Sequence, residues 1–289
     1  MANPERWTLQ RMLRWSTDYF KDKRVNAPRY SAETLLSMIC GFSQRMDIYV
    51  QFDRPLEEHE LQAYKLLIKR RVAGEPLAYI TGTQNFLGLD FSVVKGVLIP
   101  RFDTENIAIT AVEWLRNKDK DASPHAVLDL CCGTGALGIA TVKLSHRQCD
   151  LTLADIDPLA LDCSRDNGWK HLPQSDLKVI KSNMFECIDH QFDVILCNPP
   201  YLTQYEIDQL DGEMTQEPTI ALYGGEDGLD FYRILAENYS RYLKPNGCMF
   251  VEAGYQQKNQ LRDLFGNAWQ DEIYDKADRF RGAHISPVY

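Results

Sequence analysis

The sequence predicts an α/β fold, in which a parallel sheet carries helices on both faces and a small helical bundle precedes it. Two observations predict this organisation. From residue 126 onward, apolar runs such as "AVLDL", "DLTLAD" and "FDVILC" alternate with helical segments, and such repeats build parallel sheets. In residues 1–75 the large apolar residues instead recur at helical spacing. The chain therefore divides into a helical domain and a sheet domain.

The N-terminal region, residues 1–75, reads as three helices. They are expected near residues 7–23, 31–42 and 56–74, with Ser31 as the N-cap of the second and Gly74 as the stop of the third. Acidic residues in the first turn of the third helix and basic residues in its last turn complement the helix dipole. A small helical bundle is the predicted result.

Residues 76–100 predict a β-hairpin linker. The pieces "LAYITG", "QNFLGLDFSVV" and "GVLIP" are rich in strand-forming residues and are broken by glycines. The sheet domain is then expected over residues 101–289. It opens with a helix after "PRFDTE", N-capped by Asp103 or Thr104, and it closes with two antiparallel strands near residues 271–275 and 279–286.

Composition and charge narrow the functional classes. The chain has 289 residues, 44% apolar and 25% charged, and a net charge of −9. Residues 1–75 carry +3 and residues 76–289 carry −12, so no direct nucleic-acid binding is expected, because a phosphate backbone attracts basic surfaces. No run approaches the roughly 20 apolar residues of a membrane span. The eight cysteines form no C-x-x-C pair, which favours thiols in a cytoplasmic protein without a metal.

A glycine-bearing turn, "VLDLCCGTGALGIA", joins a strand to a helix and is typical of a cofactor site. Gly133 and Gly135 allow a ligand to approach the backbone. Asp155, 20 residues after Gly135 at the end of the next strand, is placed to bind a ribose diol. A dinucleotide and S-adenosylmethionine both fit this pattern. Asp129 favours S-adenosylmethionine, because it would repel a pyrophosphate but would bind the ammonium of a methionine moiety.

The segment "NPPY", residues 198–201, raises a different question, because two prolines follow directly after the buried strand "FDVIL". Proline cannot extend a strand. The fourth strand of such a sheet ends beside the reactive sulfonium, so this corner is predicted at the chemistry. Asn198 and Pro199 supply two oxygen acceptors for a planar –NH₂, Pro200 stiffens the corner, and Tyr201 offers a stacking face. The other reading of the corner is a rigid turn.

The corner predicts catalysis by positioning. The acceptors grip the –NH₂ so that its lone pair faces the methyl group, and they stabilise charge developing on nitrogen. No strong general base is required, and none of the six histidines lies in these motifs.

These residues resemble a known family. "NPPY" after "FDVIL" looks like the motif of amino-methyltransferases, and "GEPLAYITG", "PRFDTE", "EPTIALYGGEDGLDFY" and "VEAGYQQ" are similar to the PrmC/HemK family. The resemblance implies a Rossmann-like class I S-adenosylmethionine-dependent methyltransferase sheet with a helical N-terminal domain. Because a lone glutamine offers little surface for recognition, we expect the helical domain, residues 1–75, to dock the protein substrate. It also implies an enzyme that methylates the glutamine in the Gly-Gly-Gln loop of peptide chain release factors.

The resemblance also implies roles for residues. Asn198, Pro199, Pro200 and Tyr201 would bind the substrate glutamine, with Asn198, Pro199 and Tyr201 as the catalytic set. The residues implied to bind S-adenosylmethionine are Phe102, Asp129, Cys131, Gly133, Gly135, Asp155, Ile156, Asn183, Met184 and Asn198. The family usually has a glycine in place of Cys131 and an acid in place of Asn183; the Asn183 side-chain oxygen can still bind the adenine amino group.

Three other functions stay open at this point. A relative that methylates a ribosomal-protein glutamine shares the NPPY corner. An adenine-specific nucleic-acid methyltransferase shares it too, although the acidic charge counts against this reading. A binding module that keeps the fold without catalysis would be supported only by Cys131 and Asn183.

Overall fold

The computed structural model describes residues 6–118, 124–173 and 175–287, and the chain forms two compact units. The first unit comprises the chain up to Gly82 together with Asp211–Gln216. The second comprises Thr83–Leu210 and the chain from Glu217 onward. The division therefore falls at Gly82, and a six-residue segment from the middle of the second half of the chain belongs to the N-terminal unit.

The first unit is helical. Its helices are α1 (Leu9–Asp22), α2 (Pro28–Ile39), α3 (Asp47–Val50), α4 (Glu58–Val72) and α5 (Leu77–Thr81), and the 3₁₀ turn η1 (Gly212–Gln216) joins them. An apolar core that includes Leu9, Leu35, Leu36 and Ile48 holds the helices together. Since each of these side chains is fully buried, the unit has a core of its own.

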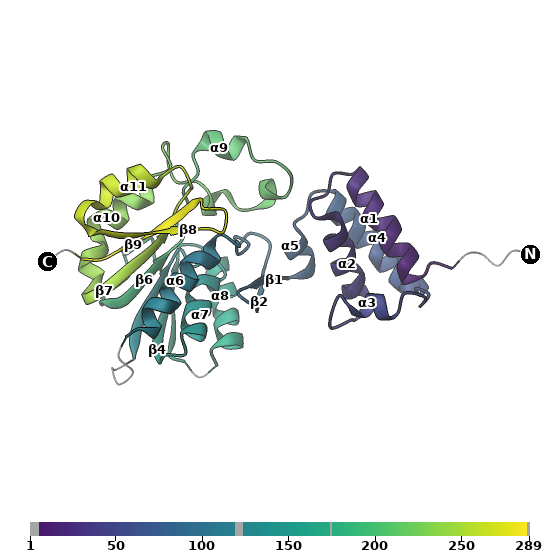
Figure 1. Cartoon of the computed structure of the whole chain (residues 1–289), viewed down its shortest axis with the longest axis horizontal. Helices are drawn as coiled ribbons and strands as arrows, with labels where there is room; N and C mark the ends of the chain where they lie inside the picture. The colour runs from purple at the N-terminus through teal and green to yellow at the C-terminus, as the bar shows by residue number, and fades with distance from the viewer. Residues whose placement is uncertain (1–5, 119–123, 174, 288–289) are drawn as a thin grey trace, which may run out of the picture. The chain divides into compact units, whose positions relative to one another are not determined.

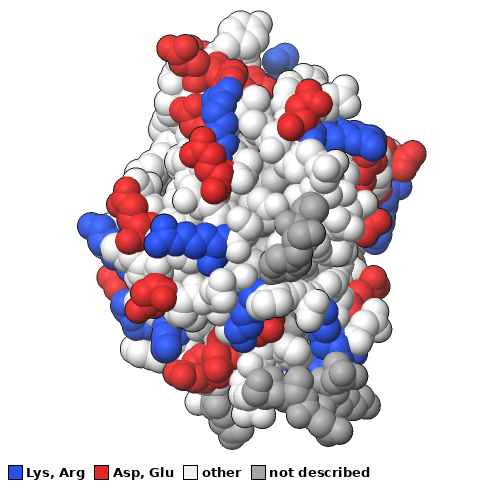
Figure 2. Space-filling model, turned by 90° about the vertical axis from the view of Figure 1, so that its left-hand side faces the viewer, with Lys and Arg blue, Asp and Glu red and all other residues white. Residues whose placement is uncertain are grey.

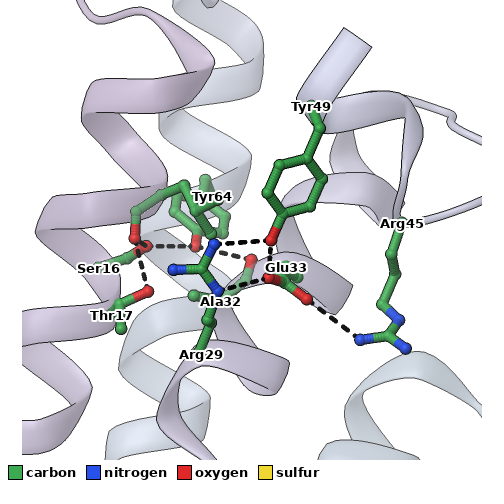
Figure 3. Close-up of polar contacts among 9 residues, drawn as sticks. Ser16, Thr17, Arg29, Ala32, Glu33, Arg45, Tyr49 and Tyr64 are labelled. Atoms are coloured by element: carbon green, nitrogen blue, oxygen red, sulfur yellow. Dashed lines mark hydrogen bonds and ion pairs between the residues drawn. The ribbon is translucent and has the colours of Figure 1, made fainter. Parts of the chain in front are cut away.

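Polar side chains also cross this core, as Figure 3 shows. The Tyr64 hydroxyl, on α4, donates to Ser16 Oγ of α1 at 2.9 Å and lies 3.2 Å from the Ala32 carbonyl oxygen of α2. Nearby, the Glu33 carboxylate accepts from Arg29 Nε at 2.9 Å and from Arg45 at 3.1 Å. A buried tyrosine hydroxyl needs such partners, so these bonds fix how α1, α2 and α4 pack.

Arg71 attaches η1 to the first unit. Its side chain is 3% exposed, and its Nη2 lies 2.5 Å from Glu213 Oε1. The same guanidinium donates to Ser31 Oγ and to the carbonyl oxygens of Asn26 and Glu75. A buried cation requires this number of partners, and Glu213 supplies its counter-charge.

The second unit begins with the hairpin β1 (Thr83–Phe86) and β2 (Leu89–Ser92). The elements that follow are α6 (Thr104–Arg116), β3 (His125–Leu130), α7 (Ala136–Ser145), β4 (Cys149–Asp155), α8 (Pro158–His171), β5 (Leu177–Lys181), β6 (Phe192–Cys197), α9 (Gln204–Asp208), η2 (Thr219–Ala221), α10 (Asp230–Tyr242), β7 (Leu243–Glu252), α11 (Lys258–Phe265), η3 (Gly266–Ala268), β8 (Trp269–Tyr274) and β9 (Phe280–Ile285). The larger sheet has the order β5-β4-β3-β6-β7-β9-β8. Strands β3 to β7 run parallel, and β9 is antiparallel to both of its neighbours.

Helices cover both faces of this sheet (Figure 1). Inward-facing residues alternate along β3 and β6 as a pleated strand requires. Val127 and Val194 pack with α6 and α7 on one face. Leu128 and Ile195 pack with α10 and α11 on the other. The predicted α/β class with a helical N-terminal bundle and two closing antiparallel strands is therefore confirmed.

Within the second unit, the hairpin packs against α6, α7 and α8. Phe86 and Phe91 are buried with α6 and α7. The buried side chain of Asn167, on α8, accepts from Ser92 N at 2.7 Å and donates to Ser92 O at 3.0 Å. One asparagine thus satisfies both backbone groups at the end of β2 and ties the hairpin to α8.

Three local predictions were wrong. "LAYITG" forms helix α5 because Pro76 starts a turn that Gly82, with φ +73°, ends. "GVLIP" is not a strand; Val97 N donates to Val94 O in a turn. Ser31 is not an N-cap, because Pro28 begins α2 three residues earlier.

Membrane insertion finds no support in these elements. Among the described helices, none combines the length and apolar character that crossing a bilayer requires.

Removal of the Tyr64 hydroxyl should weaken the first unit. We expect Tyr64→Phe to lower the free energy of unfolding by about 1–2 kcal/mol, because Ser16 and Ala32 lose a buried partner. Urea denaturation measures this change. Tyr30→Phe is the control, since Tyr30 is 48% exposed. Equal stabilities for the two variants would contradict a stabilising role for the buried hydroxyl.

Candidate active site

The candidate site lies where the strand order of the sheet reverses. β3 and β6 are neighbours although two strands separate them in sequence, and Leu130 pairs with Cys197 at their carboxyl ends. Ligands in open α/β sheets bind at such a reversal. The two predicted motifs, the glycine turn after β3 and the NPPY corner after β6, therefore begin side by side.

A pocket opens at this end of the sheet. Nine of the residues predicted from the sequence line it: Asp129, Cys131, Gly133, Asp155, Ile156, Asn183, Met184, Asn198 and Pro200. Its wall also includes side chains that the sequence analysis did not assign: Val97, Leu98, Pro100, Arg101, Thr104, Ser182, Pro218, Ile220, Ala221 and Phe231. The ends of the strands, the segment before α6 and the segment before α10 thus all contribute to the wall of the pocket.

The two glycines of the turn have different tasks. Gly133 has φ +53°, and a Cβ added there would meet only Val97, at 4.0 Å, so this side of the backbone faces open space. Gly135 has φ +77°, but its added Cβ would lie 2.8 Å from Ile139 and 3.2 Å from Ser164. Gly133 therefore leaves room for a ligand, whereas Gly135 is required for packing at the N-terminus of α7.

Asp129 and Asp155 hold the turn from two strand ends. Asp129 Oδ2 accepts from Gly138 N at 2.8 Å, and Asp155 Oδ2 accepts from Gly133 N at 2.9 Å. Burial raises the pKa of both carboxyl groups, most strongly for Asp129, and the Gly138 and Gly133 N–H groups oppose that rise. Among the described residues, no hydrogen bond or ion pair joins a cationic side chain to the buried Asp129 or the half-buried Asp155, and two such carboxyl groups suit a ligand that brings a positive charge and hydroxyl groups.

Cys131 occupies a backbone conformation that favours glycine. Its φ is +56°, which costs about 1–2 kcal/mol for a residue with a Cβ. Its thiol lies 3.6 Å from Met184 Sδ. Asn183 donates through Nδ2 to Glu186 Oε1 at 2.9 Å, which directs the amide nitrogen away from any ligand that its oxygen would bind.

In the NPPY corner, the Asn198 amide has a defined partner. Asn198 Nδ2 donates to Thr104 Oγ1 at 3.2 Å, across from the start of α6. Gly224 packs against the same corner, since an added Cβ would lie 2.6 Å from Tyr201 Cα. Gln257 Nε2 donates to Tyr201 O at 3.2 Å. Thr104 therefore holds the Asn198 side chain, whereas Gly224 and Gln257 hold the backbone of the corner at Tyr201.

Four predicted residues do not line the pocket: Phe102, Gly135, Pro199 and Tyr201. The Phe102 side chain is 70% exposed, although its neighbours Arg101 and Thr104 do line the pocket. Tyr201 packs beside the core of the α10 and α11 face, and burial raises the pKa of its hydroxyl. Their predicted contacts with ligands stay predictions.

Glu217 and Glu252 are buried carboxylates that the sequence analysis missed. Glu217 accepts from Ile99 N at 3.1 Å and pairs with Arg101 at 2.6 Å, so it fastens the segment before α10 to the pocket wall. Glu252, at the end of β7, is 2% exposed. Burial raises its pKa to about 7, and a hydrogen bond from Thr104 opposes that rise. The quoted "EPTIALYGGEDG" and "VEA" segments contained both residues, but only as marks of resemblance.

Known protein families match parts of both the helical unit and the sheet unit of this chain. Residues 11–82 match the PrmC N-terminal domain, and residues 111–222 match the methyltransferase small domain. A release factor glutamine methyltransferase of Geobacter sulfurreducens is 39% identical over 267 residues, which cover 91% of this chain and 89% of that one. Another from Rhodopirellula baltica is 32% identical and covers 92% of this chain and 96% of that one.

The chain belongs to the release factor glutamine methyltransferase family. The resemblance to PrmC/HemK proteins is thereby confirmed, and so is the class of enzyme, an S-adenosylmethionine-dependent methyltransferase. The solved structure of the hMettl16 catalytic domain in complex with the MAT2A 3′UTR hairpin 6 shares the fold. It has a TM-score of 0.52 at 11% identity and covers 80% of this chain and 82% of that one. Among the described residues, no group of three or more His, Cys, Asp or Glu side chains could hold a metal ion.

Glu252 should make stability depend on pH. Folding raises the pKa of this carboxyl group from 4.5 to about 7. The protonated Glu252 side chain therefore stabilises the fold fully below pH 4.5, and this stabilisation is lost as the pH rises through about 7. We expect Glu252→Gln, which cannot ionise, to gain about 3 kcal/mol relative to the wild type between pH 4.5 and 8. Denaturant unfolding across this range measures the difference, and a constant difference would contradict the raised pKa.

Proposed function

We propose that this protein transfers a methyl group from S-adenosylmethionine to the side-chain amide nitrogen of the glutamine in the Gly-Gly-Gln loop of peptide chain release factors. The observation that carries the proposal is the Asn198 amide, which lies at the carboxyl end of β6, lines the pocket and is anchored by Thr104. The high-coverage relatives are named for the same reaction.

The proposed cofactor site is the turn after β3 with the ends of β4 and β5. The open side of Gly133 gives room for the ligand. Asp129 would bind the ammonium of the methionine moiety, Asp155 the ribose hydroxyls and Asn183 Oδ1 the adenine amino group. Cys131, Ile156 and Met184 would contribute apolar contacts from the pocket wall. Phe102 and Gly135 do not line the pocket. Phe102 would lie near the methionine end of the ligand, and Gly135 would act through the fold of the turn.

When bound, S-adenosylmethionine supplies an electrophilic methyl group. Asn198 Oδ1 and the Pro199 carbonyl would accept the two amide hydrogens of the substrate glutamine, Pro200 would keep the corner stiff, and Tyr201 would hold the amide plane. These residues would hold the amide nitrogen with its lone pair toward the methyl group that S-adenosylmethionine would supply. The nitrogen would gain the methyl group as the sulfur leaves with its electron pair, and it would lose one proton afterwards. Such positioning can supply about 7–11 kcal/mol of the barrier, and the two acceptors stabilise positive charge on nitrogen.

The helical region, residues 1–75, is proposed to dock the protein substrate. A single glutamine side chain offers little surface for recognition, so affinity must come from a larger contact. Trp15, Tyr30, Met38 and Leu66 are apolar and more than two-fifths exposed in this region. A release factor in the cytoplasm is the partner we propose.

A nucleic-acid adenine methyltransferase is disfavoured. The net charge is −9, and on the face drawn in Figure 2 basic and acidic side chains are interspersed rather than gathered into a basic stripe. Binding of a phosphate backbone needs such a stripe. A ribosomal-protein glutamine is the nearer alternative substrate, and the names of the relatives favour the release factor.

Mass spectrometry tests the function directly. Purified release factor is incubated with this protein and S-adenosylmethionine, and a ribosomal-protein preparation is incubated in parallel. We expect one added methyl group on the glutamine of the Gly-Gly-Gln loop. Methylation of a ribosomal-protein glutamine alone would overturn the substrate, and methylation of neither would overturn the function.

Gly133 tests the cofactor site. Gly133→Ala should weaken S-adenosylmethionine binding at least tenfold, because the new methyl group projects into the open space of the pocket and the left-handed backbone is strained. Gly88→Ala is the matched control, since Gly88 also has positive φ with open space around it but lies in the β1–β2 hairpin. Isothermal titration calorimetry measures both affinities; equal losses would show that strain alone is responsible.

Asn198 tests the chemistry. Asn198→Ala removes an acceptor that the proposed mechanism needs in the transition state, so the turnover number should fall by about 10²–10³-fold. Cofactor affinity should stay within about threefold, because the contacts proposed for Asp129 and Asp155 remain. Initial rates of methyl incorporation and calorimetry with S-adenosylmethionine give the two numbers. Turnover close to that of the wild type would remove Asn198 from the mechanism.

A further inference from the structure

We propose that Glu252 is a positioning residue that acts through Thr104 to decide which end of the Asn198 amide faces the substrate. The proposal rests on the proposed function, because an acceptor is needed only if the substrate presents an N–H group. The two ends of an asparagine amide have nearly the same shape and opposite hydrogen-bonding character. A flipped Asn198 would present its NH₂ group to the substrate amide and would repel it.

Thr104 by itself cannot fix the orientation. Its hydroxyl lies 3.2 Å from Asn198 Nδ2. A hydroxyl both donates and accepts, so it would accept from Nδ2 in one orientation of Asn198 and donate to Oδ1 in the flipped one. A further group must take up the hydroxyl proton for the bond to have a single direction.

Glu252 is placed to do this. Val251 of β7 pairs with Cys197 of β6, so the next residues in each strand, Glu252 and Asn198, lie at the same level of the sheet. Thr104, at the start of α6, accepts from Asn198 Nδ2 and interacts with the Glu252 carboxylate, whose pKa it lowers. An ionised carboxylate only accepts. The Thr104 proton therefore goes to Glu252, the Thr104 lone pair accepts from Asn198 Nδ2, and Asn198 Oδ1 is left to face the substrate.

The surroundings of Glu252 let it change its charge. Arg101 and Arg281 face it, but Arg101 pairs with Glu217 at 2.6 Å, and Arg281 pairs with Asp103 and Asp275 at 3.0 and 2.9 Å. Their charges are thus largely neutralised by other carboxylates. Asp103 and the burial of Glu252 both disfavour the charged form.

Two tyrosines complete these surroundings. The Tyr232 hydroxyl, on α10, donates to the Glu252 backbone oxygen at 2.9 Å, and Tyr201 lies close enough to interact with the carboxylate. Glu252 Oε2 has no hydrogen-bond partner among the described residues. A carboxylate this weakly compensated takes up a proton near neutral pH, and burial raises its pKa to about 7.

Protonation removes the directional constraint. A neutral carboxyl group can donate to the Thr104 oxygen, and Thr104 is then free to donate to Asn198 Oδ1. The amide can flip in that state. Methyl transfer should therefore increase as the pH rises through about 7, as Glu252 ionises and Asn198 is held in its accepting orientation.

Kinetics on the full chain test the proposal. At pH 8, Thr104→Val should lower the turnover number about 10²-fold through misplacement of Asn198, and Thr104→Ser should recover most of that loss because it restores the hydroxyl. Glu252→Gln should lower turnover about tenfold and should abolish the rise between pH 6 and 8. KM for S-adenosylmethionine should change less than threefold in all three. A Glu252→Gln profile with the wild-type midpoint, or Thr104→Val turnover within twofold of wild type, overturns the proposal.

A second measurement needs no substrate. In protein labelled with ¹⁵N-asparagine, the Asn198 side-chain resonance is assigned by its loss in Asn198→Ala. We expect it to shift with a midpoint near pH 7 in the wild type and to stay constant in Glu252→Gln. If it titrates while release factor is not methylated, the proposed function fails and the role of Glu252 stands. If release factor is methylated and the resonance does not titrate, the role of Glu252 fails alone.

Discussion

The pairing of β3 with β6 is the constraint on which the active site depends. The chain places β4 and β5 on one side of β3 and then returns to place β6 on the other side. Leu130 and Cys197 therefore end level with each other, and the glycine turn and the NPPY corner open from adjacent strands. A shift of one residue in this register would turn every side chain of β6 to the opposite face. Burial of Val194 and Leu196 against one layer and of Ile195 and Cys197 against the other prevents such a shift.

Three carboxyl groups at this end of the sheet, those of Asp129, Asp155 and Glu252, have different surroundings. Asp129 and Asp155 each accept a backbone N–H group from the glycine turn or from α7, which orients the side chain toward the pocket wall. Glu252 instead lies at the end of β7, level with Asn198 in the sheet, and interacts with the Thr104 hydroxyl. In the arrangement we propose, carboxyl groups thus serve a ligand site at two strand ends and orient a neighbouring amide at a third. The difference comes from the donor near each group, which is a backbone N–H for the two aspartates and a hydroxyl for Glu252.

The sequence predicted the parts of this site that are local in the chain. The glycine turn and NPPY each directly follow an apolar strand, so their position at the end of the sheet could be inferred from residues on either side. Thr104 and Glu252 could not be found in this way, because they are 94 and 54 residues from Asn198 in the chain. The position of α6 brings Thr104 to Asn198, and the pairing of β6 with β7 brings Glu252 level with it. The error at Ser31 was local, because Pro28 begins α2 three residues earlier and leaves Ser31 inside the helix. In α5 the error was of another kind, since the effect of Pro76 and Gly82 outweighed the strand preference of the residues between them.

The position of β9 in the sheet limits the order in which the strands can assemble during translation. It is translated after every other described strand, yet it lies between β7 and β8. On a ribosome, the helical layers and the strands β3 to β7 can assemble while β8 still has no neighbour to pair with. Arg281, on β9, then arrives last beside Glu252, Asp103 and Asp275. The nascent chain would thus acquire its complete active-site surroundings only once β9 has left the ribosome.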